Sequence, residues 1–110
     1  MSSIGLTDLR GRLLAEAAEA ASHRAAETVY GDRRSTLKQT LIALVAGAAL
    51  AEHDNPGEAT LLVLDGHVRL IAAGATVEGR AGDLLTVPPS RHSLESVTDA
   101  VVLLSVAKHA

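Results

Sequence analysis

The feature that most constrains the fold is a succession of short apolar segments, separated by glycine and proline, that begins at Arg24 and continues almost to the end of the chain. Segments of about four to eight residues rich in Val, Leu and Ile are typical of β-strands, and Gly or Pro between them marks turns. Many short strands at close spacing predict an all-β barrel or sandwich. The expected strands are residues 24–30, 35–45, 49–53, 59–64, 67–72, 76–78, 83–87, 93–96 and 100–106.

Two of the expected connections have a distinct turn chemistry. Residues 54–57 read Asp-Asn-Pro-Gly, which is turn sequence throughout. Asp65-Gly66 is a strong signal for a two-residue hairpin. We therefore expect residues 67–72 to return alongside residues 59–64.

The residues before the strands predict one amphipathic helix over about residues 7–21, since leucine and alanine recur there at three- and four-residue steps. Thr7 and Asp8 are expected to cap its N-terminus. The apolar stripe is weak, so the helix needs a surface to lie on. We divide the chain into an N-terminal helical segment, 1–23, and a barrel domain, 24–110.

Three expected strands are apolar on both faces, at residues 41–45, 61–64 and 101–104. A strand with one face in water would alternate between apolar and polar residues. The outer faces of these strands must therefore be covered, either by the N-terminal helix or by a second copy of the chain. We expect a homodimer, because one alanine-rich helix is too narrow to cover three strands.

Composition excludes several classes of partner. The chain of 110 residues has a net charge of −3 and no cluster of basic residues, which argues against binding a nucleic-acid backbone. Phe and Trp are absent and Tyr30 is the only aromatic residue, so single-stranded nucleic acid would find no stacking platform. Any internal cavity is expected to be aliphatic. Cysteine is absent, which excludes disulfides and thiolate metal ligands.

The sequence carries no membrane or secretion signal that we recognise. The N-terminus lacks a basic segment followed by an apolar one. The longest apolar run, residues 41–51, is shorter than the about 20 residues that span a bilayer. A cytoplasmic protein with no membrane partner is expected.

Two histidines stand at expected strand ends beside turns, and both can point into one small barrel. His53 ends the strand 49–53, and His92 follows a proline-containing turn. Two converging imidazoles are the minimum of a transition-metal site. Asn55 lies two positions after His53 and would share its strand face. Gln39 is a further candidate for lining the cavity, although an ordinary surface position fits it equally well.

The stretches around these histidines resemble the two conserved motifs of the cupins, in particular the small single-domain microbial members. The resemblance covers roughly residues 36–106 and implies a double-stranded β-helix, or jelly-roll, barrel. In the second motif this chain has Ser90 where the cupin pattern has glycine, and its histidine comes one residue early. The matching residues are Gly47, His53 and Gly66 in the first motif, and Gly82, Pro88 and His92 in the second.

The resemblance also implies that part of the cupin metal-ligand set is missing from this chain. Cupins that hold a metal use two histidines and a glutamate from the first motif and one histidine from the second. Here Asn55 replaces the second histidine and Ala59 the glutamate, while strand alternation sends the neighbouring Glu58 to the opposite face. His53, His92 and Asn55 could hold Zn, Ni, Fe or Mn, but with reduced affinity because the anionic ligand is missing.

Two functions from different classes follow from this degenerate set. One is a binding module that holds a small molecule in the barrel through His53, His92, Asn55 and Gln39, with or without a divalent metal. The other is a metal-dependent cupin enzyme, of oxygenase or isomerase type, acting on a small organic substrate. A purely structural histidine pair that fixes the loops is a third interpretation. The sequence names neither a substrate nor an activity, because cupins host unrelated functions.

Overall fold

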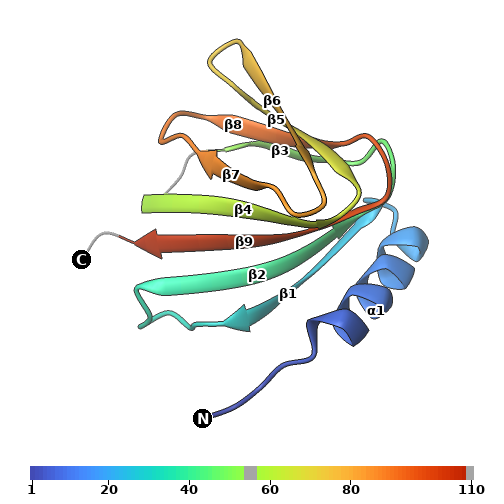
Figure 1. Ribbon diagram of the computed structural model, residues 1–110, viewed down its shortest axis with the longest axis vertical. Helices are drawn as coiled ribbons and strands as arrows, with labels where there is room; N and C mark the ends of the chain where they lie inside the picture. Colours follow the sequence, from blue (N-terminus) through green and yellow to red (C-terminus); the bar gives the residue numbers. More distant parts are fainter. Residues whose placement is uncertain (54–56, 109–110) are drawn as a thin grey trace.

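The computed structural model describes residues 1–53 and 57–108, except for the side chains of residues 52 and 53. Within these residues the chain forms one helix and nine strands, arranged in two facing antiparallel sheets (Figure 1). The elements are α1 (Leu6–Glu19), β1 (Arg24–Tyr30), β2 (Leu37–Leu44), β3 (Ala49–His53), β4 (Gly57–Asp65), β5 (His67–Ala72), β6 (Ala75–Arg80), β7 (Leu84–Val87), β8 (His92–Ser96) and β9 (Ala100–Lys108). The predicted all-β jelly-roll barrel with a short N-terminal helix is confirmed.

The two sheets interleave along the chain. The first has the strand order β1-β2-β9-β4-β7 and the second the order β3-β8-β5-β6. Neighbours in each sheet are mostly distant in sequence, because the chain crosses repeatedly from one sheet to the other. All the predicted strands are present, with ends that differ by a few residues at most.

The hairpin predicted at Asp65-Gly66 is wrong. β4 pairs with β7 and β9, whereas β5 pairs with β6 and β8, so the chain changes sheets at this point instead of folding back. Gly66 has φ +85°, and a Cβ built on it would lie 2.1 Å from the carbonyl oxygen of Asp99. The glycine is needed for a corner between sheets, and this requirement leaves the same sequence signal as a tight hairpin.

The barrel interior is filled by aliphatic side chains from both sheets. Alternate residues of a strand face opposite sides, so one face of each strand contributes to this core. On β2 the inward residues are Ile42 and Leu44, whereas Leu41 and Ala43 face outward. The largest members of the core are Ile42, Leu44, Leu61, Val63, Val68, Leu70, Leu85, Val87, Leu94 and Val102.

Helix α1 covers part of the outer face of the first sheet. Its buried residues Leu9, Leu13 and Ala17 pack against Leu41, Ala43 and Val101, which have no exposed surface. The helix begins after Gly5, which makes no side-chain capping bond, so the predicted cap at Thr7 or Asp8 is wrong. Both residues lie inside the first turn, where the Asp8 carboxylate can instead interact favourably with the helix dipole.

The helix packs mainly over β1 and β2 and reaches β9, but it does not cover the far side of this sheet. On β7 the side chain of Leu84 is 61% exposed, and its partner on β4, Leu62, is partly buried. In the described part of the chain, no helix is long and apolar enough to cross a membrane.

Candidate functional site

One end of the barrel carries the predicted site residues. Figure 1 shows that β2, β4 and β8 begin at this end and that β3, β7 and β9 finish there. The register agrees, since Gly57 lies opposite Lys108, Ala59 opposite Val87, and His53 opposite His92. We call this the His92 end of the barrel.

His92 is the first residue of β8 and is only 5% exposed. It shares its face of the strand with Leu94, a member of the interior core. The Pro-Pro-Ser-Arg turn after β7 brings the Ser90 carbonyl within 3.0 Å of the His92 Nδ1 atom. A carbonyl oxygen only accepts, so Nδ1 carries the hydrogen, and in the neutral ring Nε2 is the accepting nitrogen. The turn thus fixes both the ring orientation and its tautomer.

His53 is brought next to His92 along the backbone. It is the last residue of β3, and its Cα is paired with that of His92 across the ladder between β3 and β8. The side chain of His53 and the whole of Asn55 lie outside the described residues. The predicted meeting of the two imidazoles, and the part assigned to Asn55, therefore stay predictions.

The structure has no carboxylate at the position where the resemblance implies a metal-binding glutamate. Ala59 is 7% exposed and belongs to the interior core. Glu58 is exposed and lies on the opposite face of β4, across from Ala107, as strand alternation predicted. Among the described side chains, no group of three or more His, Asp or Glu could hold a metal ion. These side chains alone therefore do not fit a metal centre.

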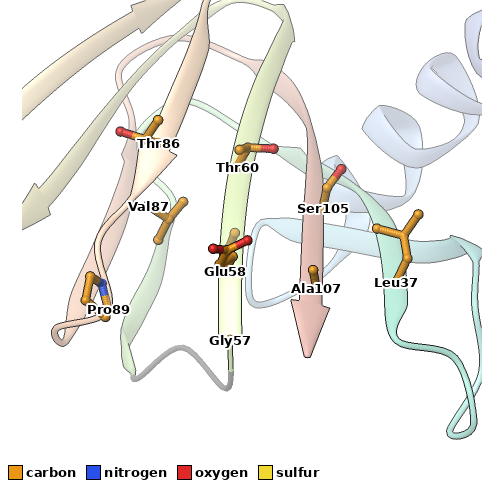
Figure 2. A pocket seen from close by; sticks show the side chains of 10 residues that line it. Leu37, Gly57, Glu58, Thr60, Thr86, Val87, Pro89, Ser105 and Ala107 are labelled. Atoms are coloured by element: carbon orange, nitrogen blue, oxygen red, sulfur yellow. The ribbon is translucent and has the colours of Figure 1, made fainter. Parts of the chain in front are cut away.

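Gln39 is not brought together with His92. It lies on the outward face of β2 with Leu41, and its Nε2 donates a hydrogen bond of 3.1 Å to Ser105 Oγ. Ser105 is paired with Thr60, and Thr60 with Thr86, so polar side chains cross several strands in one row. This row borders a shallow groove of about 650 Å³ on the outer face, to which Leu37 and Glu58 also contribute (Figure 2).

Lys38 is a residue that the sequence analysis missed. It shares the inward face of β2 with Ile42 and is paired with Val106, which in turn is paired with Ala59. Lys38, Val106, Ala59 and Val87 thus form one row across the first sheet at the His92 end. Alternation could have identified this row only if the inward face were known. The apolar run 41–45 hides it, because both of its faces are equally apolar.

A small apolar cavity adjoins His92. It has a volume of about 280 Å³ and lies between the β5–β6 hairpin and the turn that follows β7. Ala72, which lines it, is the Cα partner of His92, and Ser90, which also lines it, accepts the hydrogen bond of the His92 ring. The other lining residues include Leu70, Val77 and Pro88. The cavity wall is mostly aliphatic, as the composition predicted, and its polar members are Thr86 and Ser90.

Comparison with protein families identifies this architecture. The family model for the cupin domain matches residues 40–107, which is more than half of the chain. The chain belongs to the cupin family. The predicted resemblance to the cupins is thereby confirmed. No curated protein matches this cupin.

Solved structures agree with the family in fold. A conserved protein of unknown function from Streptococcus pyogenes has a TM-score of 0.74 and 24% identity, covering 83% of this chain and 79% of its own. A cupin superfamily protein from Desulfitobacterium hafniense has a TM-score of 0.72 and 16% identity, covering 78% of each chain. Salicylate 1,2-dioxygenase from Pseudaminobacter salicylatoxidans reaches a TM-score of 0.75 at 23% identity, covering 89% of this cupin but 32% of the enzyme. At these identities the likeness extends to the fold alone.

Proposed function

We propose that this cupin binds a small organic molecule at the His92 end of its barrel. The observation that carries the proposal is His92 itself, a buried imidazole held by the Ser90 carbonyl beside an aliphatic cavity of about 280 Å³. Small-molecule sites are mostly apolar hollows in which a few fixed polar groups orient the ligand. An oriented imidazole among aliphatic side chains has this character.

A fragment screen followed by amide NMR shifts tests this proposal. We expect bound fragments to shift the signals of Ala72, Ser90 and His92, and His92→Gln to weaken binding by about tenfold through loss of one oriented hydrogen bond. His67→Gln, which removes a histidine from the outer face of the second sheet, is the matched control. Fragments that shift only the outer groove around Thr60 and Ser105, or no fragment binding at all, would contradict the proposal.

The metal-dependent enzyme is the second candidate, and two features support it. His53 and His92 are paired across β3 and β8, and the His92 Nδ1 atom donates to a backbone carbonyl, as metal-binding histidines commonly do. His53, His92 and Asn55 would hold the ion, which would act as a Lewis acid on a small organic substrate. Elemental analysis of protein purified without an affinity tag or chelator tests this. About one metal per chain, lost in His92→Ala, would support the enzyme, whereas sub-stoichiometric metal unchanged by this substitution would exclude it.

A homodimer is part of the same proposal. Helix α1 leaves the outer face of β4 and β7 open, and Leu84 is strongly exposed there. A second copy on this face would remove that apolar surface from water.

A further inference from the structure

The small cavity beside His92 is a lateral opening of the barrel. It is bordered by the β5–β6 hairpin, the strand β7 and the turn after it, and β6 and β7 are the edge strands of their sheets. Gly79 on β6 packs closely on the first sheet, since a Cβ built there would lie 2.9 Å from Leu85 and 3.1 Å from Val63. From this contact the hairpin projects away from β7 (Figure 1), and Val77 is already 52% exposed. The cavity therefore lies where the two sheets part.

Small side chains at the hairpin tip keep this opening free. Ala72 and Ala75 are paired across the hairpin on the face that carries Leu70 of the interior core, and both line the cavity. Ala73, which also lines it, has φ +51°, a left-handed conformation that is unfavourable for alanine. Unfavourable backbone conformations of this kind cluster at binding sites. Larger side chains in place of Ala72 and Ala75 would fill the space that binds a ligand.

The described residues that line the cavity offer hydrogen bonds but no charge. Their polar members are Thr86 and Ser90, whose hydroxyls can both donate and accept. Figure 2 shows the Thr86 hydroxyl pointing away from Thr60, its partner on β4. The charged residues of the hairpin lie on its other face, where Arg69 Nε donates a hydrogen bond of 2.9 Å to Glu78. An ionic ligand would lose water in this cavity without gaining a counter-charge, which is costly.

We propose that the molecule bound in this cavity is a short, uncharged aliphatic alcohol or amide. Its polar group hydrogen-bonds to the hydroxyls of Thr86 and Ser90, and its hydrocarbon part packs against Leu70 and Val77. The charged residue next to Ser90, Arg91, is exposed and is not among the lining residues. The volume of about 280 Å³ is just below the range of about 300 to 1,000 Å³ typical of ligand sites, which favours a short chain. This inference rests on the proposed small-molecule function and adds the chemical class of the ligand.

NMR titration with pentan-1-ol, pentanoate and pentylammonium tests the inference, because the three probes share a carbon chain and differ in charge. We expect pentan-1-ol to shift the amide signals of Ala72 and Ser90 and to bind at least about tenfold more tightly than either ion. Thr86→Val keeps nearly the same shape and removes the hydroxyl, so it should weaken pentan-1-ol binding by about fivefold. Thr60→Val, the matched change at the paired residue on β4, should leave all three affinities unchanged.

A substitution that fills the cavity gives an independent test. Ala75→Leu places a larger aliphatic side chain at the hairpin tip and should abolish pentan-1-ol binding. Because Ala75 is exposed, this variant should fold normally, and an unchanged thermal unfolding midpoint would verify this. Binding of pentan-1-ol that survives Ala75→Leu would mean that the alcohol binds elsewhere, and the inference would be wrong.

The possible outcomes separate this inference from the proposed function. If either ion binds as tightly as pentan-1-ol, or if Thr86→Val leaves the affinity for pentan-1-ol intact, the assignment of an uncharged ligand is wrong while small-molecule binding stands. If no probe binds at millimolar concentration, this assignment is also wrong, and the fragment screen alone decides the proposed function.

Discussion

Gly66 illustrates how a single residue can be recognised in the sequence while its role is mistaken. The Asp65-Gly66 pair correctly predicted a sharp change of direction, and the structure has one, with positive φ at the glycine. Two-residue hairpins and corners between sheets require the same backbone conformation. What distinguishes them here is the close approach of Asp99 and Ala100, and no local sequence pattern records this contact.

Substituting Gly66 separates the cost of its conformation from the cost of its contacts. Gly66→Ala combines positive φ with a Cβ only 2.1 Å from the Asp99 carbonyl oxygen, so we expect a loss of at least about 3 kcal/mol. Gly47→Ala is the matched control, since Gly47 has φ +86° but nothing within 4 Å of its Cβ position. That variant should lose about 1 to 2 kcal/mol. Equal losses in urea unfolding would show that the contact is unimportant.

Glu78 on β6 is expected to make stability depend on acid pH. Hydrogen bonds, first from His67 and then from Arg69 Nε at 2.9 Å, hold the pKa of its carboxyl below the ordinary value of 4.5. A depressed pKa in the folded state stabilises the fold above the unfolded pKa, and this contribution is lost as the pH falls through the folded pKa. The advantage of the wild type over Glu78→Gln should therefore shrink below about pH 4.5.

Urea unfolding of the wild type and Glu78→Gln at several pH values between about 3 and 7 checks this prediction. Glu58→Gln, which removes a carboxyl from the outer face of β4, is the control. Parallel curves for the wild type and Glu78→Gln would refute the role of Glu78.

At the level of elements, the strands could be predicted well and their partners poorly. Apolar runs and turn residues are local properties, and they gave β1, β3 and β5 the bounds that the structure has. Pairing is not local, because β4 finds β9 and β7 only after the chain has crossed between sheets. For the same reason the faces of β2 could not be assigned, so Lys38 was missed and Gln39 was considered for the interior.

Helix α1 should contribute strongly to stability even though its apolar stripe is weak. Leu13 is 1% exposed and packs into the cluster with Leu41 and Val101, so Leu13→Ala should cost about 3 kcal/mol. The neighbouring Leu14 is only partly buried, and Leu14→Ala should cost about 1 kcal/mol. Urea unfolding monitored by circular dichroism measures both losses. Similar small losses would mean that the helix is only loosely attached to the sheet.

At the scale of the whole molecule, the sequence predicted the fold class correctly but the cover on the outer sheet face only in part. The family and the barrel were predicted from motifs and from glycine and proline turn residues that span most of the chain, and both are confirmed. The expected need for cover on the outer sheet face was sound for β2 and β9, where α1 provides it. The extent of that cover depends on how the helix crosses the sheet, which a sequence pattern does not specify.

The remaining open face leads to the prediction of a homodimer. Leu84 is 61% exposed beside Leu62 on the outer face of β4 and β7, and burying this surface against a second copy is favourable. Light scattering at micromolar concentration should give twice the chain mass of 11.3 kDa.

Leu84→Glu should give monomers, because it introduces a charge into the interface from both copies. Val77→Glu, at a residue 52% exposed on the second sheet, should leave the dimer intact. A wild-type protein with the mass of a single chain would refute the prediction. If both variants were monomers, the assignment of the interface to β4 and β7 would be wrong.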